Sequence, residues 1–207
     1  MNKSNKHDLY LNAYINTLKE YVKAHEENPE QDTKTIFKKL IVYGVKVIKT
    51  KEEPEYIDRE TAENDFQFAS TIKGLMATLT PKEFTELYPI AKEYDGHKYD
   101  AKDYFYTRDY ISTLDQNKPI GDEILHFIWE YHNWELTKFN AEIMKCISRL
   151  RRLEGQPSLM EEFANEMGIK TYSMHKDQNG NQFMIDNETR KPIKISKPKA
   201  KHLKIIK

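Results

Sequence analysis

The sequence contains one arrangement that is typical of a metal site, a Glu-x-x-His pair formed by Glu123 and His126. Di-iron helical bundles use this spacing, and their facing helices supply a second such pair with further glutamates. The chain contains no second Glu-x-x-His. We therefore favour a His126 that lies on a helix surface or at the edge of the core. A metal-dependent enzyme at this pair remains a third hypothesis for the function.

Other catalytic signatures are absent from the sequence. There is no nucleophile motif, glycine-rich phosphate loop, His-Glu-x-x-His signature or Cys-x-x-Cys pair. The single cysteine, Cys146, precludes an internal disulfide and fits a reducing compartment. It falls within a predicted helix, where a small core residue is favoured over a reactive thiol. We predict that the protein is not an enzyme and uses neither a cofactor nor a metal.

Positive charge is concentrated at the C-terminal end of the chain. The last 18 residues hold 8 Lys and Arg and no acid, so the rest holds 25 bases and 33 acids. A tail of +8 is thus joined to a body of −8, an asymmetry that points to partners. Phosphate contacts by this tail would make nucleic-acid binding strongly salt-dependent. The residues predicted to bind nucleic acid are Arg190, Lys191, Lys194, Lys197, Lys199, Lys201, Lys204 and Lys207.

Two other interpretations of the basic tail stay open. It also fits a solvated terminus that keeps the acidic body soluble, or one that folds back on that body. The tail contains apolar residues that an electrostatic arm does not need, among them Ile195, Leu203 and Ile206. We therefore expect part of it to pack against protein.

Tyrosines and acids are interleaved between residues 88 and 110. Acidic charges repel phosphate, so the segment suits a protein partner better than a single-stranded nucleic acid. The alternative is a packed corner of the fold whose hydroxyl groups face water. The residues predicted to bind protein are Tyr94, Tyr99, Tyr104, Tyr106, Tyr110, Asp100 and Asp103.

Apolar residues at helical spacing predict a mainly α-helical fold. A first helix, from about residue 8 to 26, has an apolar face formed by Leu11, Ile15, Leu18 and Val22. A second helix reaches about residue 49, and Asp58 is the predicted N-cap of a third. Thr80, Pro81 and Glu83 form the clearest start signal, a capping box with proline at the first helical position.

One long helix, from about residue 122 to 154, is predicted to be the centre of the bundle. At 1.5 Å per residue it would be about 50 Å long. Beyond it the apolar period changes to two, which predicts a small antiparallel β-hairpin or meander with a turn at "DQNG". The predicted organisation is a helical domain at 1–168, a β-meander at 169–196 packed on it, and a basic tail at 197–207.

A helix-turn-helix is a rival interpretation of residues 160–177. Ala164, Gly168, Ile169 and Met174 fall where that motif needs a small residue, a turn glycine and two apolar anchors. It would place a recognition helix at 170–177. Because Thr171, Tyr172 and Ser173 are poor helix formers, we favour the hairpin.

Localisation signals favour the cytoplasm. The start, "MNKSNKHD", has no apolar signal-like segment, and the most apolar run, "LIVYGVKVI", is too short to cross a bilayer. We predict a cytoplasmic protein without membrane contact, and a homodimer is compatible with the sequence.

Two segments resemble small accessory proteins of phages and mobile elements in low-GC Gram-positive bacteria. They are "TLTPKEFTELYPIAKEYDGHKYDAKDYFYT" and "GIKTYSMHKDQNGNQFMIDNETRKPIKISKPK", together about a third of the chain. The resemblance implies a protein made in the cytoplasm of a bacterial host that binds a host or phage protein. Anti-defence roles such as anti-CRISPR inhibition are among the functions that it implies.

Two main hypotheses for the function follow. In the first, the acidic, tyrosine-bearing body binds a host or phage protein while the basic tail contacts nucleic acid or an acidic neighbour. In the second, the protein is a sequence-specific DNA-binding transcriptional regulator that uses a helix-turn-helix at 160–177.

Overall fold

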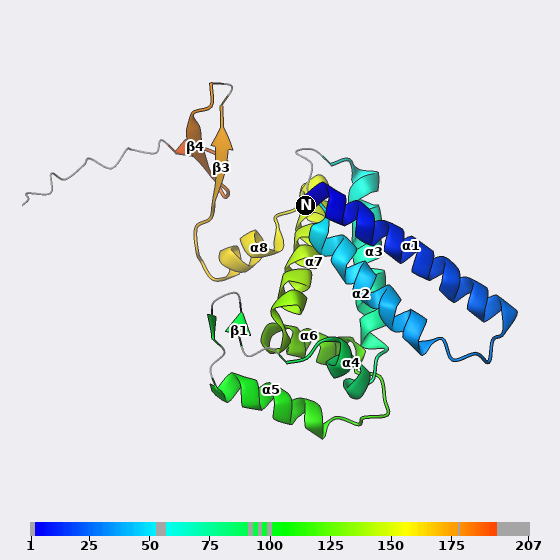
Figure 1. Ribbon diagram of the computed structural model, residues 1–207. Helices are drawn as coiled ribbons and strands as arrows, with labels where there is room; N and C mark the ends of the chain where they lie inside the picture. Colours follow the sequence, from blue (N-terminus) through cyan, green and yellow to red (C-terminus); the bar gives the residue numbers. More distant parts are fainter. Residues whose placement is uncertain are drawn as a thin grey trace, which may run out of the picture. The chain divides into compact units, whose positions relative to one another are not determined.

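The computed structural model describes residues 3–52, 57–90, 93–94, 97–98, 101–177 and 179–193 (Figure 1). The chain divides into two compact units, Met1–Leu153 and Glu154–Lys207. The division falls before the last helix, whereas the sequence placed it after that helix, at residue 168. The last helix and the sheet therefore form one unit, which we call the C-terminal unit. We call Met1–Leu153 the helical unit.

The secondary structure confirms the mainly helical class with a small C-terminal antiparallel sheet. In the helical unit the described elements are α1 (Lys3–Glu27), α2 (Lys34–Thr50), α3 (Arg59–Ala77), α4 (Pro81–Leu87), the β1 (Glu93–Tyr94) and β2 (His97–Lys98) pair, α5 (Ala101–Thr113), α6 (Gly121–His132) and α7 (Trp134–Leu153). The C-terminal unit contains α8 (Leu159–Glu166), β3 (Tyr172–Lys176), β4 (Gln182–Asp186) and β5 (Pro192–Ile193), with strand order β3-β4-β5. No described helix combines the length and the apolar character needed to span a membrane.

Two predicted helix starts are confirmed by their hydrogen bonds. Asp58 Oδ1 accepts from the backbone N–H of Thr61 at 2.7 Å, at the start of α3. At the start of α4, the N–H of Glu83 donates to Thr80 Oγ1 at 3.3 Å, and the N–H of Thr80 donates to Glu83 Oε2 at 3.1 Å. These caps satisfy backbone donors that a helix start leaves without partners.

The core of the helical unit lies mainly among α2, α3, α6 and α7, which pack against one another (Figure 1). Gly44 brings α2 close to α3, because a Cβ atom at this position would overlap with the side chain of Ile72. The large apolar side chains with almost no exposure include Ile41, Val45, Ile72, Met76, Phe84, Leu125, Ile128, Trp129, Leu136 and Phe139. Large aromatic and branched side chains thus provide the buried area that stabilises this unit.

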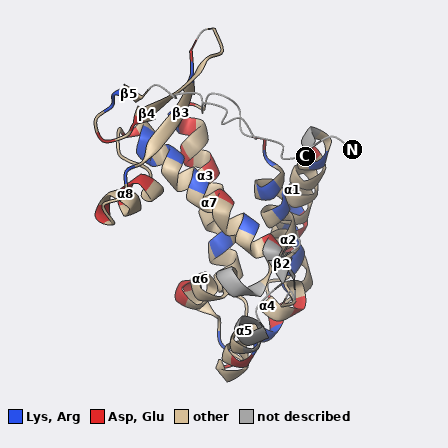
Figure 2. Cartoon of the chain, turned by 90° about the vertical axis from the view of Figure 1, so that its left-hand side faces the viewer, with Lys and Arg blue, Asp and Glu red and all other residues tan. Residues whose placement is uncertain are grey.

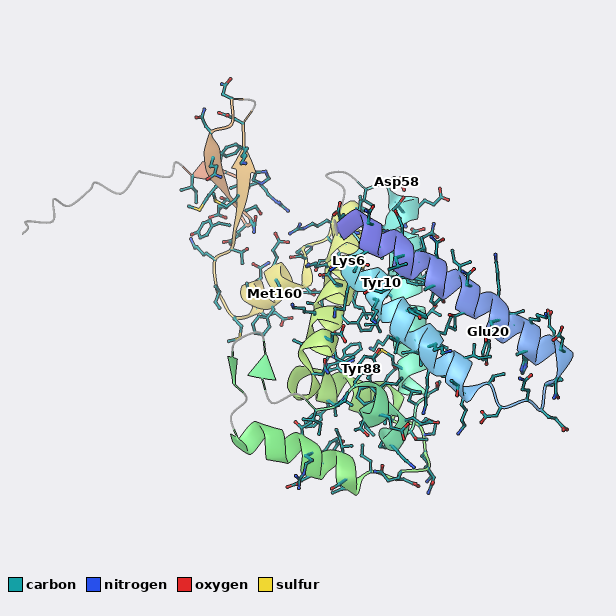
Figure 3. The ribbon with its side chains drawn as sticks, in the orientation of Figure 1. Lys6, Tyr10, Glu20, Asp58, Tyr88 and Met160 are labelled. Atoms are coloured by element: carbon teal, nitrogen blue, oxygen red, sulfur yellow. The ribbon has the colours of Figure 1, made fainter. Side chains whose placement is uncertain are left out.

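Helix α1 packs mainly on α2, and most of its apolar stripe is not part of this contact. Tyr10 lies on the side that faces α2 (Figure 3), where Lys46 Nζ is 5.3 Å from its ring. Thr17 is buried, and Tyr14 packs edge-on against Phe68 at 5.1 Å. Of the stripe that the sequence singled out, Ile15, Leu18 and Val22 are 38%, 38% and 44% exposed. Leu11, its fourth member, is half-buried and lines a cavity of the helical unit.

The predicted long helix at 122–154 is wrong in one respect, because it is broken at Asn133 into α6 and α7. Asn133 has extended backbone angles, and its Oδ1 accepts from the N–H of Glu135 at 2.7 Å, as a capping side chain does. Thr137 Oγ1 donates to the carbonyl of Trp129 at 2.8 Å, which satisfies an acceptor at the end of α6. The apolar period continues across the break, so hydrophobic spacing alone does not reveal it.

Candidate protein-binding surface

The C-terminal unit buries little of its apolar surface. Among its described residues, 154–177 and 179–193, Ala164 is the one apolar residue that is buried. The chain has a single cysteine, and it lies in the helical unit, so no internal disulfide reinforces this unit. Small domains are marginally stable by themselves, and those without a sufficient core usually need a disulfide, a metal or a partner.

Local hydrogen bonds define α8 at both ends. Ser158 and Glu161 form a second capping box, in which the N–H of Ser158 donates to Glu161 Oε2 at 2.7 Å. Gly168 has a φ of +68°, which favours glycine, and the N–H of Ile169 donates to the carbonyl of Ala164 at 2.7 Å. The helix is short, but its start and its end are both specified by the sequence.

One face of α8 is apolar and exposed. Met160, Phe163 and Met167 lie three and four residues apart, so they share a side of the helix. Their exposed fractions are 73%, 56% and 62%. Figure 3 labels Met160 on this helix. We call these three residues the α8 apolar face.

The other side of α8 is acidic. Glu161, Glu162 and Glu166 occupy it, and Figure 2 shows acidic residues as red segments on this helix. An amphipathic helix normally buries its apolar stripe against other parts of a protein. Here that stripe is exposed, so α8 has the character of a helix that binds a groove.

The sheet of the C-terminal unit also has an apolar row on one face. Met174 of β3 lies opposite Met184 of β4, and Met184 lies opposite Ile193 of β5. Tyr172 is on the same face, two residues before Met174. Met174 is 57% exposed and Tyr172 is 45% exposed, whereas Met184 and Ile193 are half-buried, so the β3 side of this face is the uncovered part. Strand β3 is also an edge of the sheet, and exposed edges can pair with other strands.

The opposite face of the sheet combines polar and apolar residues. The rings of His175 and Phe183 stack with their centroids 5.7 Å apart. Ser173 lies opposite Ile185, and Ile185 lies opposite Pro192. A single layer of three strands therefore carries apolar side chains on both faces.

The turns of the sheet are held by side-chain hydrogen bonds. Asp186 Oδ1 accepts from the N–H groups of Glu188 and Thr189, both at 2.9 Å, and these bonds lower the pKa of the Asp186 carboxyl. Asn187 Nδ2 donates to Thr171 Oγ1 at 3.0 Å and connects the turn to the start of β3. The sheet thus keeps its register by local polar contacts, although it has little apolar core.

The helix-turn-helix interpretation of residues 160–177 is wrong. It needs a recognition helix at 170–177, and the structure has strand β3 there instead, paired antiparallel with β4. β-branched and aromatic residues in this segment favour a strand, as the preferred interpretation assumed. The second functional hypothesis therefore loses the helix that would enter the DNA major groove.

The tyrosines predicted to bind protein are described only in part. Tyr106 is 55% exposed on α5, and Tyr110 packs against Phe127 with ring centroids 4.8 Å apart. Tyr94 is in β1, and Tyr104 and Asp103 are in α5, where the structure describes the backbone. Tyr99 and Asp100 lie outside the described residues. The packed Tyr110 fits the interpretation as a corner of the fold, and the exposed Tyr106 fits a contact site.

The basic tail lies mostly outside the described residues. Arg190 and Lys191 are described, and both are exposed in the turn between β4 and β5. Arg190 has a φ of +56°, and its N–H donates to the carbonyl of Asp186 at 2.8 Å. These two bases therefore belong to the sheet. The remaining predicted bases, Lys194, Lys197, Lys199, Lys201, Lys204 and Lys207, are outside the described part.

The Glu-x-x-His pair lies on α6, with both residues in the same helix. Across the described ranges, no three His, Cys, Asp or Glu side chains come close enough to hold a metal ion. Glu123 is exposed and His126 is exposed, which is the surface position that we favoured.

Sequence reasoning missed the α8 apolar face and the apolar row on the sheet. The periodicity of Met160, Phe163 and Met167 was visible, but periodicity does not tell whether a helix face is covered. Comparison of the chain with protein-family models, with curated proteins and with solved structures finds no match.

Proposed function

We propose that this protein is a non-enzymatic binding protein whose C-terminal unit recognises a protein partner. The observation that carries the proposal is the exposure of the large apolar side chains of that unit. They are Met160, Phe163, Met167, Ile169, Tyr172 and Met174, each 45% to 73% exposed.

The size of this apolar surface fits an interface. Six side chains that each expose on the order of 100 Å² together approach the roughly 800 Å² that one partner buries in a standard interface. Methionines are common on surfaces that adapt to a partner, because their side chains are unbranched and polarisable. Covering these residues would also supply the buried area that the unit lacks within itself.

The chemistry of α8 indicates the kind of partner. An apolar groove would accept Met160, Phe163 and Met167, as grooves accept amphipathic helices in other complexes. The acidic side of α8 favours a groove whose rim carries lysine or arginine. We therefore propose a protein with an apolar groove and a basic rim as the occupant of this surface.

The basic tail adds a second contact in this proposal. Its charge of +8 is separated in sequence from the acidic body, which favours a polyanion such as nucleic acid as its ligand. A protein that itself handles nucleic acid would satisfy both contacts at once. The resemblance to accessory proteins of phages and mobile elements supports such a role, including inhibition of a host defence machine.

Capture from the cytoplasm of a low-GC Gram-positive host, with and without nuclease, tests the proposal. A variant with Met160→Ser, Phe163→Ser and Met167→Ser should lose a nuclease-resistant protein partner that the wild type retains. A matched variant with Asn165→Ser, on the polar side of the same helix, should keep it. Equal capture by both variants would contradict the assignment of this surface.

Methionine oxidation provides a direct readout of burial in the complex. In the free protein, Met160, Met167 and Met174 should oxidise quickly, whereas the fully buried Met76 should not. Binding of the captured partner should protect the first three and leave Met76 unchanged. If these methionines are already protected in the free monomer, the surface is covered within the chain and the proposal fails.

Salt-dependent retention on DNA tests the role of the tail. Truncation after Ser196 should abolish it without changing the capture of the protein partner. Retention that survives truncation would assign the contact to another part of the chain.

A further inference from the structure

Strand β3 is the longer of the two edges of the C-terminal sheet. It has five residues, and β4 is its one neighbour among the described strands. Two backbone bonds fix the phase of the β3–β4 pair. The N–H of Asp177 donates to the carbonyl of Asn181 at 3.0 Å, just after β3. The N–H of Asn187 donates to the carbonyl of Thr171 at 3.1 Å, just before β3.

Every second residue of β3 directs its backbone groups away from β4. Bonded and non-bonded positions alternate along an antiparallel pair, and here the bonded positions of this strand are the odd-numbered ones. The N–H and carbonyl groups of Tyr172, Met174 and Lys176 therefore point to the free edge. The side chains of the same three residues are exposed, and no proline interrupts the strand.

The opposite edge of the sheet is protected. Strand β5 has two residues, and one of them is Pro192. The bond from the N–H of Asp186 to the carbonyl of Lys191 sets the phase of β4 and β5, so that Pro192 faces outward. Proline has no N–H, and proline on an edge strand is one way in which proteins prevent further pairing. The β3 edge has no such block, so it is the edge that can accept another strand.

The sequence of β3 is complementary to an antiparallel copy of itself. A two-fold axis at Met174 pairs all five residues: Met174 with its own copy, Tyr172 with Lys176, and Ser173 with His175. This register places no two lysines opposite each other, whereas a register centred on Lys176 would do so. It also places the Lys176 side chain beside the Tyr172 ring, a favourable contact for a cation.

This pairing would continue the apolar row of the sheet. Ile193, Met184 and Met174 form the row in one copy, and the second Met174 would follow directly. The row would then cross the three strands of each copy without a polar interruption. The C-terminal unit buries one apolar residue among those described, and small domains with so little core are often stabilised by oligomerisation.

We propose that the β3 edge binds the β3 edge of a second copy of this chain, antiparallel and centred on Met174. The three outward residues of each strand would exchange backbone hydrogen bonds with those of the other. Interfaces below ~1,200 Å² in total are typical of weak complexes, so we expect a dimer that forms at high protein concentration. The inference goes beyond the proposed function, because it does not use the α8 apolar face.

Disulfide trapping in the full-length chain tests this register, with Cys146→Ser as the background. Met174→Cys should form a covalent dimer on oxidation, because bonded pairs have Cα atoms about 5.5 Å apart, a usual disulfide spacing. Tyr172→Cys is the matched control, because the two copies of this residue would lie four positions apart along the strand, roughly 13 Å. It should not form a dimer alone. An equal mixture of the Tyr172→Cys and Lys176→Cys proteins should form mixed dimers.

Proline substitution tests the backbone pairing. Met174→Pro removes an outward N–H without removing a bond to β4, whereas Met174→Thr changes the side chain and keeps the N–H. Sedimentation equilibrium measures the mass as the protein concentration rises. The wild type should approach twice the monomer mass of 24.6 kDa, Met174→Thr should dimerise severalfold more weakly, and Met174→Pro should stay monomeric. Circular dichroism shows whether each variant is folded, and the cysteine series stands without the proline variant.

Four results would overturn the proposal. They are a wild type that stays at the monomer mass, a folded Met174→Pro that dimerises like the wild type, equal trapping of Tyr172→Cys and Met174→Cys, and a monomeric wild type whose β3 edge binds a strand of a captured host protein. The serine variant of Met160, Phe163 and Met167 should dimerise like the wild type. Failure of the protein-binding proposal for α8 is therefore distinguishable from failure of this one.

Discussion

Gly44 of α2 lies directly against Ile72 of α3, so close that an added Cβ atom would overlap with the Ile72 side chain unless that side chain moved. Ile72 is fully buried in the core of the helical unit. The contact joins two helices that also form walls of the cavity that Leu11 lines. The absence of one methyl group therefore sets how closely α2 and α3 pack.

Gly44→Ala is expected to destabilise the protein by about 1–3 kcal/mol, the usual cost of overpacking a core. The intrinsic preference of helices for alanine over glycine, roughly 0.5–1 kcal/mol, offsets part of this cost. Denaturant unfolding measures the net change. The matched control is Gly74→Ala in α3, where an added Cβ meets nothing within 4 Å. That variant should be unchanged or slightly more stable, and a loss of stability there would contradict the packing argument.

The capping box of α4 predicts a stability loss in acid. Hydrogen bonds from the Thr80 backbone lower the pKa of Glu83 below its ordinary value of 4.5, and Lys34 contributes in the same direction. A carboxyl with a lowered folded-state pKa stabilises the fold fully above the unfolded value and loses that effect as the pH falls through the folded value.

The experiment compares the free energy of unfolding at pH 7 with that below pH 4.5, the ordinary carboxyl value. Glu83→Gln should be less stable than the wild type at pH 7, and the two should converge in acid. Thr80→Ala should cost about 1 kcal/mol at neutral pH, as other lost N-caps do. If the difference in free energy of unfolding between Glu83→Gln and the wild type is the same at both pH values, the fold does not favour the ionised Glu83 carboxyl.

Tyr88 predicts a stability loss in alkali. Burial raises the pKa of its hydroxyl well above the ordinary value of 10.0, and the negative charge of Glu135 adds to this effect. The unfolded chain therefore loses this proton at a lower pH than the folded chain does. Stability is fully present below pH 10 and falls as the pH rises further.

The free energy of unfolding is measured between pH 9 and pH 11, about one unit on each side of the ordinary tyrosine pKa. Over this range Tyr88→Phe should lose less stability than the wild type does. Tyr106→Phe removes a hydroxyl from a residue that is 55% exposed and serves as the control. Its alkaline loss should equal that of the wild type. An unchanged pH profile for Tyr88→Phe would contradict the assignment.

Truncation of the chain after Leu153 tests whether the two units differ in their ability to fold alone. The residues of the main core cluster run from Ile41 to Ile143, so all of them remain. This fragment should retain helical circular dichroism and a cooperative thermal transition. The separate fragment 154–207 should unfold without cooperativity, because its described part buries one apolar residue, Ala164. Cooperative folding of that fragment alone would show that the unit is stable without a partner.

Local signals in the sequence were sufficient to locate most helices and the sheet. The capping box at Thr80 and the N-cap at Asp58 are confirmed, since a cap is formed by residues three positions apart and needs no distant contact. The alternation in the last segment likewise predicted β3 and β4, because the strand period and the turn are both local. The mainly helical class follows from the same periodicity.

Interactions between distant residues decided the rest. The apolar spacing continues through Asn133, and the break there also involves a bond from Asn133 Nδ2 to the carbonyl of Pro89, 44 residues away. The cavity that Leu11 lines is formed by residues of α1, α2, α3 and α7, which no sequence spacing relates. The exposure of apolar residues on α1 and on α8 is likewise decided by tertiary contacts. Periodicity defines a face within its own helix, whereas its burial depends on what the rest of the chain places against it.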